Sequence, residues 1–250
     1  MIIPLYDDNP HRHISQAYVN WALIATNVLV FFLFQSGYVV GTYVADTTGF
    51  EYSYGMVPVV LFHKMLLPPE YMRIPEWLTP ISSAFLHGSW MHLAGNMLFL
   101  WVFGDNVEDD LGHFRYLFFY LACTVLSAMA YALTAPDSSS PLIGASGGIS
   151  GVVAAYVLLH PRVKIWVLVL FRIPLRLPAY WAIGAWILYQ AYFALYAYFT
   201  TSADDVAWFA HIGGLVAGGL LVLPLKSSDA PLFDRGPRQP PLNGNKHSGN

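Results

Sequence analysis

The chain has 250 residues, of which 56% are hydrophobic and only 11% are charged. A soluble globular domain carries roughly 25% charged residues, and several apolar runs here are long enough to cross the ~30 Å hydrocarbon core of a bilayer. These values exclude an ordinary soluble protein and indicate a helical protein with several membrane spans. The apolar runs are continuous and not alternating, which argues against a membrane β-barrel. The net charge of −3 and the lack of a basic block give no indication of nucleic-acid binding.

Residues 1–18 are expected to form a cytoplasmic N-terminal segment. Their sequence begins MIIPLYDDNPHRH, which is acidic where a cleavable signal would have a basic region and an apolar core. The first spanning helix should therefore direct insertion itself.

Apolar segments separated by polar or proline-rich connections predict six spanning helices. With their loops they form one bundle over residues 19–225, so the expected fold is an all-α membrane protein with six transmembrane helices. The predicted ranges are Val19–Val40, Trp90–Phe103, Arg115–Leu133, Ser146–Leu159, Pro178–Phe199 and Val206–Leu225.

Other segments are not expected to span. The connection 41–86 contains five prolines and should lie at the membrane interface. The segment Val163–Phe171 is apolar but short and flanked by arginines, so we expect a surface turn. The polar run Phe103–Gly112 is interpreted as a helix stop with capping carboxylates. Residues 227–250 are polar and rich in Pro, Gly and Asn, which is typical of a disordered cytoplasmic tail.

The basic residues predict the orientation of the bundle. With the N-terminus inside, ten Lys and Arg residues fall on the inner side and two, Lys64 and Arg73, on the outer side. Cytoplasmic loops carry the excess of positive charge, so both termini are expected in the cytoplasm. Ser146 and His211 then lie at similar shallow depth on the outer side.

Ser146 is the first candidate for chemistry. It lies in the run PLIGASGGISG, between Gly144 and Gly147, at the start of an apolar helix. Backbone N–H groups without intrahelical partners and the positive end of the helix dipole lie beside such a serine, and they can stabilise an oxyanion that forms next to its hydroxyl. The alternative is an N-cap serine with glycines that serve packing alone.

His211 is the second candidate. Gly214 and Gly218 follow it at helical spacing, and Gly147 and Gly151 share a face of the helix that begins at Ser146. Small-residue faces of this kind let two helix backbones approach closely, which would bring the imidazole to the serine hydroxyl. A neutral histidine suits general-base work. The alternative is a histidine with a structural hydrogen bond.

We therefore predict a Ser146–His211 dyad and not a triad. No acidic residue lies in the outer halves of these helices to orient the imidazole. The polar residues within spans, Asn27, Gln35 and Gln190, are interpreted as helix–helix hydrogen bonds.

A third constellation is HGSWMHLAGN, from His87 to Asn96. His92 and Asn96 are four residues apart, so they face one way and can donate hydrogens to a developing negative charge. His87 is expected at the helix entrance. An interhelical hydrogen bond is the alternative role for Asn96.

No metal or other cofactor is expected. A metal site formed by His87, His92 and His211 is the rival interpretation, but it lacks an HExxH-type spacing and a nearby carboxylate. The single cysteine, Cys123, excludes an intramolecular disulfide and a multi-cysteine metal site. Because Cys123 lies in an apolar helix, we expect it to serve as a packing residue in the interior of the bundle.

Taken together, these residues resemble the rhomboid family of intramembrane serine proteases. The resemblance covers about residues 79–225 and rests on HxxxN (His92, Asn96), GASG (Gly144–Gly147) and AHIGGLVAG (Ala210–Gly218) in that order. It implies a six-helix fold with Ser146 as nucleophile and His211 as base and acid. It also implies an oxyanion hole formed by His92, Asn96 and the N–H of Ser146.

The resemblance implies further expectations. The substrate would be the transmembrane segment of another membrane protein, cut near the outer surface of the bilayer, and the site of action would be a bacterial plasma membrane. This chain departs from some rhomboids at two places. Ser150 stands where those proteins have an aromatic residue. The Trp-Arg pair that some members carry in the first outer loop is absent from residues 41–86. The alternatives are a non-catalytic rhomboid-like protein that binds membrane proteins, and a small transporter or metal-binding membrane protein. The sequence does not give the oligomeric state.

Overall fold

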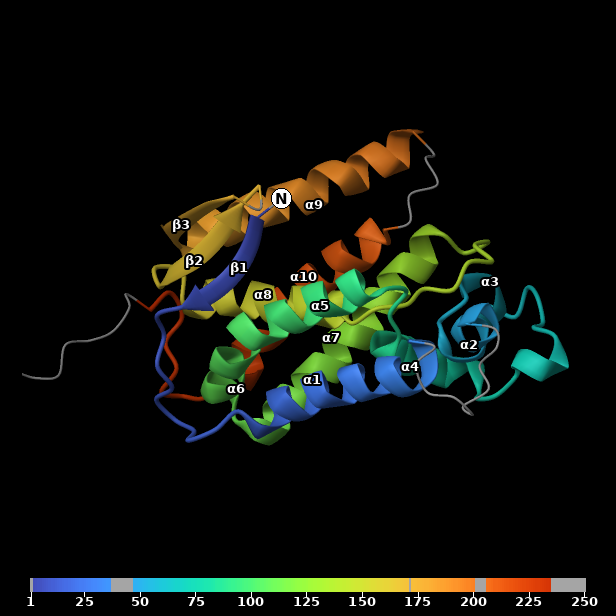
Figure 1. Cartoon of the computed structure of the whole chain (residues 1–250), viewed down its shortest axis with the longest axis horizontal. Helices are drawn as coiled ribbons and strands as arrows, with labels where there is room; N and C mark the ends of the chain where they lie inside the picture. Colours follow the sequence, from blue (N-terminus) through green and yellow to red (C-terminus); the bar gives the residue numbers. More distant parts are fainter. Residues whose placement is uncertain (1, 37–46, 171, 201–205, 235–250) are drawn as a thin grey trace, which may run out of the picture.

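A computed structural model describes residues 2–36, 47–170, 172–200 and 206–234 (Figure 1). Each predicted spanning helix has a helical counterpart in it, although residues 37–40 of the first lie outside the described residues. The long helices are α1 (Tyr18–Val30) continued by η1 (Phe31–Gln35), α5 (Trp90–Phe99) continued by η5 (Leu100–Gly104) and α6 (Asp105–Leu111), α7 (His113–Thr134), α8 (Ser146–Leu159), α9 (Ala179–Thr200) and α10 (Trp208–Leu225).

Three helical segments in the described chain are long and apolar enough to cross a membrane. They are Tyr18–Gln35, His113–Thr134 and Trp208–Leu225, and the shorter α8 is also apolar. A helix of about 20 apolar residues matches the thickness of the hydrocarbon core. The chain is therefore an integral membrane protein with a mostly helical fold.

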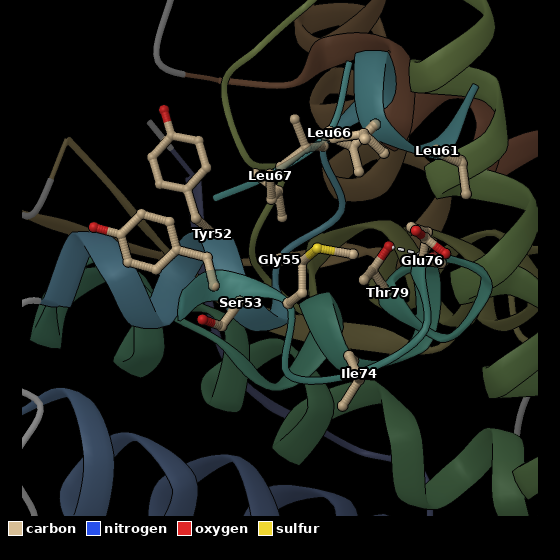
Figure 2. Close-up of a pocket in the computed structure, with 13 residues that line it drawn as sticks. Tyr52, Ser53, Gly55, Leu61, Leu66, Leu67, Ile74, Glu76 and Thr79 are labelled. Atoms are coloured by element: carbon tan, nitrogen blue, oxygen red, sulfur yellow. Dashed lines mark hydrogen bonds between the residues drawn. The ribbon is translucent and has the colours of Figure 1, made fainter. Parts of the chain in front are cut away.

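The described part of the connection before α5 contains short helices and no spanning one. These are α2 (Thr47–Tyr54), α3 (Pro58–Leu61), η2 (Pro69–Tyr71), η3 (Glu76–Leu78), α4 (Thr79–Ser82) and η4 (Ser83–Phe85). Prolines begin or lie in the first turn of several of them, where a missing backbone N–H costs nothing. Figure 2 shows the pocket that they enclose, which is lined mostly by apolar side chains such as Leu61, Leu66 and Leu67.

The expectation of an all-α fold is corrected by a three-stranded antiparallel sheet. Its order is β1 (Ile2–Asp7), β2 (Lys164–Val169) and β3 (Ile173–Pro178), and it lies against the start of α9 (Figure 1). The expected surface turn at Val163–Phe171 is thus largely a strand. Buried Ile165 and Val167 alternate with exposed Lys164 and Trp166, which is the period-two pattern of a half-buried strand.

The carboxylates after η5 hold the N-terminal segment in place. Asp109 accepts hydrogen bonds from the backbone N–H groups of residues 12–14, each at 2.7 Å. Glu108 accepts from Val19 N at 3.0 Å and Asn20 N at 2.7 Å, in the first turn of α1. They were expected to cap the end of their own helix, but they instead satisfy the free N–H groups at the start of another.

The tail that was expected to be disordered begins with an ordered stretch. Phe233 N and Asp234 N donate to the carbonyls of Leu158 and Leu159 at the end of α8, at 2.8 and 2.9 Å. Arg12 Nη1 pairs with Asp234 Oδ2 at 2.6 Å. Arg12 of the N-terminal segment and Asp234 therefore lie together at the end of α8, and residues 235–250 lie outside the described part.

Candidate active site

Ser146 is the first residue of α8, and the turn before it depends on a glycine. Gly144 has φ +119°, a conformation that residues with a side chain rarely adopt, and a Cβ there would lie 2.9 Å from the ring of His92. This turn directs the Ser146 side chain toward α10. Ser146 Oγ lies 2.8 Å from His211 Nε2, so the structure brings together the two candidates that were separated by 65 residues in the sequence.

Glycines make this contact possible because α8 and α10 touch through their backbones. A Cβ on Gly214 would lie 2.0 Å from the carbonyl oxygen of Gly147, and one on Gly218 would lie 2.2 Å from that of Gly151. A Cβ on Gly151 would also lie 2.5 Å from Cys123 Sγ of α7. Helix α8 therefore packs against both α7 and α10 at separations that larger side chains would prevent, and buried Cys123 takes part in this packing.

His211 has a hydrogen-bond partner at each ring nitrogen. Its Nδ1 lies 2.9 Å from Oε1 of Gln190, which is on α9 and only 4% exposed. The prediction that Gln190 joins two helices is confirmed, but its contact with the candidate base was missed. The signal available in the sequence was an amide within the apolar run of α9, where an unpaired polar group is costly.

The other two amides that were predicted to join helices, Gln35 and Asn27, have different hydrogen-bond partners from the ones expected. Gln35 Oε1 accepts from the backbone N–H of His87 at 3.0 Å, a contact between a helix end and a loop. Asn27 Nδ2 donates to Leu23 O within its own helix, so the expected helix–helix bond is replaced by a local one.

His92 and Asn96 lie on α5, whose start is capped by the Ser89 hydroxyl accepting from His92 N at 3.1 Å. The His92 ring lies against Gly144, two residues before Ser146. Asn96 Nδ2 is 3.0 Å from Nε2 of His87. His87 lies two residues before the N-cap Ser89, at the entrance to α5 as expected. It is 1% exposed and packs edge-to-face on His92 at 5.1 Å, so it also belongs to the interior of the site.

Metal-ligand geometry occurs elsewhere in the described chain. In the described residues, one group of three or more His, Cys, Asp or Glu residues has its ligand atoms within 4.8 Å of one another. It consists of His13, Asp109 and Asp110, at the end of the bundle that holds the N-terminal segment. His87, His92 and His211 do not form such a group. Both oxygens of Asp109 already accept backbone N–H groups, which gives that cluster a structural role.

Ser150 fills the position at which some rhomboids carry an aromatic residue. It is 1% exposed, and its hydroxyl donates to the carbonyl of Ser146 at 2.7 Å, within the same helix. A Cβ on Gly214 would lie 3.0 Å from Ser150 Cβ. Helix α10 thus approaches so closely that a ring at this position would have no room without displacing it.

The sequence comparison identifies the family. Residues 75–228, more than half of the chain, match the profile described as the Rhomboid domain. The chain belongs to the rhomboid family. The match includes every residue of the constellation around Ser146 and His211.

Three rhomboid relatives give the range of similarity. The chain is 31% identical over 166 residues to Rhomboid protein 1, mitochondrial, of Saccharomyces cerevisiae, covering 62% of this chain and 43% of that protein. It is 27% identical over 158 residues to RHOMBOID-like protein 12, mitochondrial, of Arabidopsis thaliana, covering 57% and 44%. It is 30% identical over 159 residues to Rhomboid protease GlpG of Yersinia pestis, covering 61% and 48%. The chain thus matches less than half the length of each of these relatives.

The relatives also bear on location. Their names place some of them in mitochondria, while others are bacterial. Membership of the rhomboid family and the apolar helices support an integral membrane protein, but the expectation of a bacterial plasma membrane is not supported.

Proposed function

We propose that this rhomboid protein is an intramembrane serine endopeptidase in which Ser146 and His211 form the catalytic dyad. The observation that carries the proposal is the 2.8 Å contact between Ser146 Oγ and His211 Nε2, made where two apolar helices touch through glycines. A nucleophile within hydrogen-bond reach of a base is the arrangement that activates a serine. A hydroxyl and an imidazole are costly in apolar helices, so their pairing favours a chemical role.

The reaction follows from this geometry. Ser146 Oγ bonds to the carbonyl carbon of the scissile peptide while its proton passes to His211 Nε2. The tetrahedral intermediate collapses as the C–N bond breaks and His211 returns the proton to the leaving amine. Water then repeats the sequence on the acyl-enzyme, with His211 again as base. No metal or cofactor takes part in these steps.

The oxyanion would be held by His92, Asn96 and the N–H of Ser146. The Ser146 N–H is in the first turn of α8, where helix N–H groups have no intrahelical partner. The His92 ring lies against Gly144, at the mouth of the same helix. One amide hydrogen of Asn96 is directed to His87, and its second remains to donate to an oxyanion.

Substrates would be transmembrane segments of other membrane proteins, with small residues favoured at the scissile bond. We propose six spans with both termini in the cytoplasm, which places Ser146 in the outer half of the bilayer. The excess of basic residues on the proposed inner side supports this orientation. The pairing of Arg12 with Asp234 supports a common side for both ends of the chain.

The second candidate function is a non-catalytic rhomboid-like protein that binds membrane proteins. Such a protein has no need of a serine and a histidine at hydrogen-bond distance. The pairing of the two groups therefore favours the enzyme.

The deciding experiment measures cleavage of a model transmembrane substrate by the full chain purified in detergent. Ser146→Ala and His211→Ala should each lower kcat by about 10,000-fold or more, because the two groups act as a unit. A fluorophosphonate probe should label the wild type and fail to label Ser146→Ala. Ser53→Ala removes another buried serine, whose hydroxyl bonds within α2, and should leave cleavage unchanged.

Each other outcome has a definite meaning. Cleavage that persists in Ser146→Ala overturns the assignment of the nucleophile. Absence of both cleavage and labelling in wild type, across several substrates, favours the binding protein. Loss of cleavage on addition of EDTA would indicate metal chemistry in place of the dyad.

A further inference from the structure

We propose that Gln190 is a positioning residue that holds His211 in the tautomer needed to accept the proton of Ser146. This inference rests on the proposed dyad and adds a third group to it. The sequence indicated a dyad because no carboxylate was available to orient the imidazole, and the structure places a neutral amide where a carboxylate would stand in a triad.

The geometry forms a continuous chain of hydrogen bonds across three helices. Gln190 Oε1 on α9 lies 2.9 Å from His211 Nδ1 on α10, and His211 Nε2 lies 2.8 Å from Ser146 Oγ on α8. An amide oxygen can only accept, so the proton shared with it must reside on Nδ1. Nε2 then carries the lone pair, and the serine hydroxyl can donate to it.

The opposite arrangement shows why this bond matters. If Nδ1 faced a donor or no partner, the proton could move to Nε2. Ser146 would then face an N–H and would have no base. The amide oxygen at Nδ1 disfavours that tautomer, and it also fixes the plane of the ring toward α8.

A neutral partner suits the position of this site. Gln190 is 4% exposed and lies in an apolar helix, where a carboxylate would carry a large desolvation cost between turnovers. An amide gives up some stabilisation of the imidazolium that forms during attack. In return, it can be buried without a counter-charge.

Aromatic packing holds Gln190 at its place. Trp208, one turn before His211 on α10, contacts two rings of α9: Tyr189 at 5.9 Å and Phe193 at 5.1 Å. These residues flank Gln190 in the sequence. The Trp208 ring also meets the His211 ring edge-on at 6.0 Å. The packing between α9 and α10 therefore restrains both ends of the Gln190–His211 bond.

A hydrogen bond that only stabilises the packing of α9 on α10 would have the same distances. The test must therefore separate orientation of the His211 ring from a contribution to folding stability alone. Gln190→Met keeps the length of the side chain and removes the acceptor. It should lower kcat by about 10- to 100-fold with little change in KM, which is part of the ~100- to 10,000-fold that a positioned base supplies. Asn27→Leu is the matched control: it removes a buried amide of α1 that bonds within its own helix, and it should leave kcat unchanged.

Gln190→Glu supplies a second readout. Its carboxylate still accepts from Nδ1 and adds a charge that favours the imidazolium, so most of the rate lost in Gln190→Met should return. The acidic limb of kcat/KM against pH should move to higher pH by about one unit. This shift reports contact between residue 190 and the imidazole, and the fall of kcat in Gln190→Met is what separates positioning from a structural tie.

Fluorophosphonate labelling of Ser146 in the same preparations distinguishes failure of the positioning role from failure of the dyad. If wild type cleaves and is labelled, but Gln190→Met retains kcat within twofold and Gln190→Glu keeps the wild-type pH profile, the positioning role is overturned and the dyad stands. If wild type is neither labelled nor active, the proposed function itself fails.

Discussion

The two ends of this bundle are held together by opposite means. Around Ser146, helices α8 and α10 touch through Gly147, Gly151, Gly214 and Gly218, and the site exists because side chains are absent. At the other end, the N-terminal segment, α6 and residues 227–234 are joined by buried carboxylates, backbone N–H groups and a strand pairing. One end depends on close approach, and the other depends on satisfying polar groups over long sequence separations.

This difference predicts that the two ends respond to different substitutions. At the glycine interface a single added methyl group should be enough to separate the helices, because the contact leaves no room for any side-chain atom. At the polar end, size matters less than the loss of an acceptor, because each N–H left without a partner keeps its desolvation cost.

The largest effect should come from Gly218→Ala. The new Cβ would lie 2.2 Å from the carbonyl oxygen of Gly151 and 2.4 Å from its Cα, both backbone atoms that cannot rotate away. Helices α8 and α10 must separate, which moves His211 from Ser146. We expect loss of cleavage by more than about 100-fold and a fall of several degrees in the melting temperature.

Gly219→Ala is the control on the same helix. Its Cβ would meet only Leu158 Cδ1 at 3.8 Å, an ordinary contact, so activity should persist and the helix should gain up to ~1 kcal/mol. If both alanines behave alike in a detergent-based thermal melt and in the cleavage assay, close approach is not what builds the site.

At the polar end the strongest single effect should come from Asp109→Ala. Asp109 is 4% exposed and accepts three backbone N–H groups, from Arg12, His13 and Ile14, which the alanine would leave unpaired. We expect a loss of about 3 kcal/mol. Faster hydrogen exchange of residues 12–14 should accompany it, while the contact between Ser146 and His211 survives.

Asp137→Ala is the matched loss of an exposed carboxylate. Asp137 pairs with Lys64 at 2.6 Å, but its side chain is 81% exposed, so its removal should cost less than about 1 kcal/mol. Equal losses for the two variants would show that the polar end is not held by its buried acceptors.

The sequence was sufficient for the first end and insufficient for the second, for a physical reason. Glycine spacing on one helix reports directly which face can approach a neighbour, so the apposition of Ser146 and His211 could be inferred from local patterns. The pairing of β1 with β2 joins residues about 160 positions apart, and no local pattern names the partner of a short edge strand. Carboxylates that cap another helix look the same in sequence as carboxylates that end their own.

The contact between Gln190 and His211 was missed for the same reason, because it joins residues on different helices. An amide in an apolar helix predicts a partner on another helix, and that was found. Which group it meets depends on the packing of Trp208 between Tyr189 and Phe193, which involves two helices at once. Side-chain partners across helices follow from tertiary packing, and spacing within either helix does not contain them.

The last prediction is a pH dependence at the polar end, centred on Asp7. Asp7 is 8% exposed, and burial raises its pKa from 3.8 to about 7, although a hydrogen bond from the Tyr156 hydroxyl to Oδ2 at 2.6 Å opposes the shift. The folded protein therefore keeps a proton on Asp7 between about pH 4 and 7, where the unfolded chain has released it. Stability from this group is fully present below about pH 4 and is lost as pH rises toward 7.

The slope should be at most about 1.4 kcal/mol per pH unit, and Asp7→Asn should remove it because the amide keeps the shape without titrating. Denaturant unfolding from pH 4 to 8, followed by exchange of the β1 amides, measures the difference between wild type and variant. Asp8→Asn, which removes the adjacent surface carboxylate paired with Arg176, should keep the wild-type slope. A wild-type protein whose stability relative to Asp7→Asn rises with pH would mean that Asp7 is held by its hydrogen bonds as an anion, and that the polar end is stabilised by charge and not by acceptors alone.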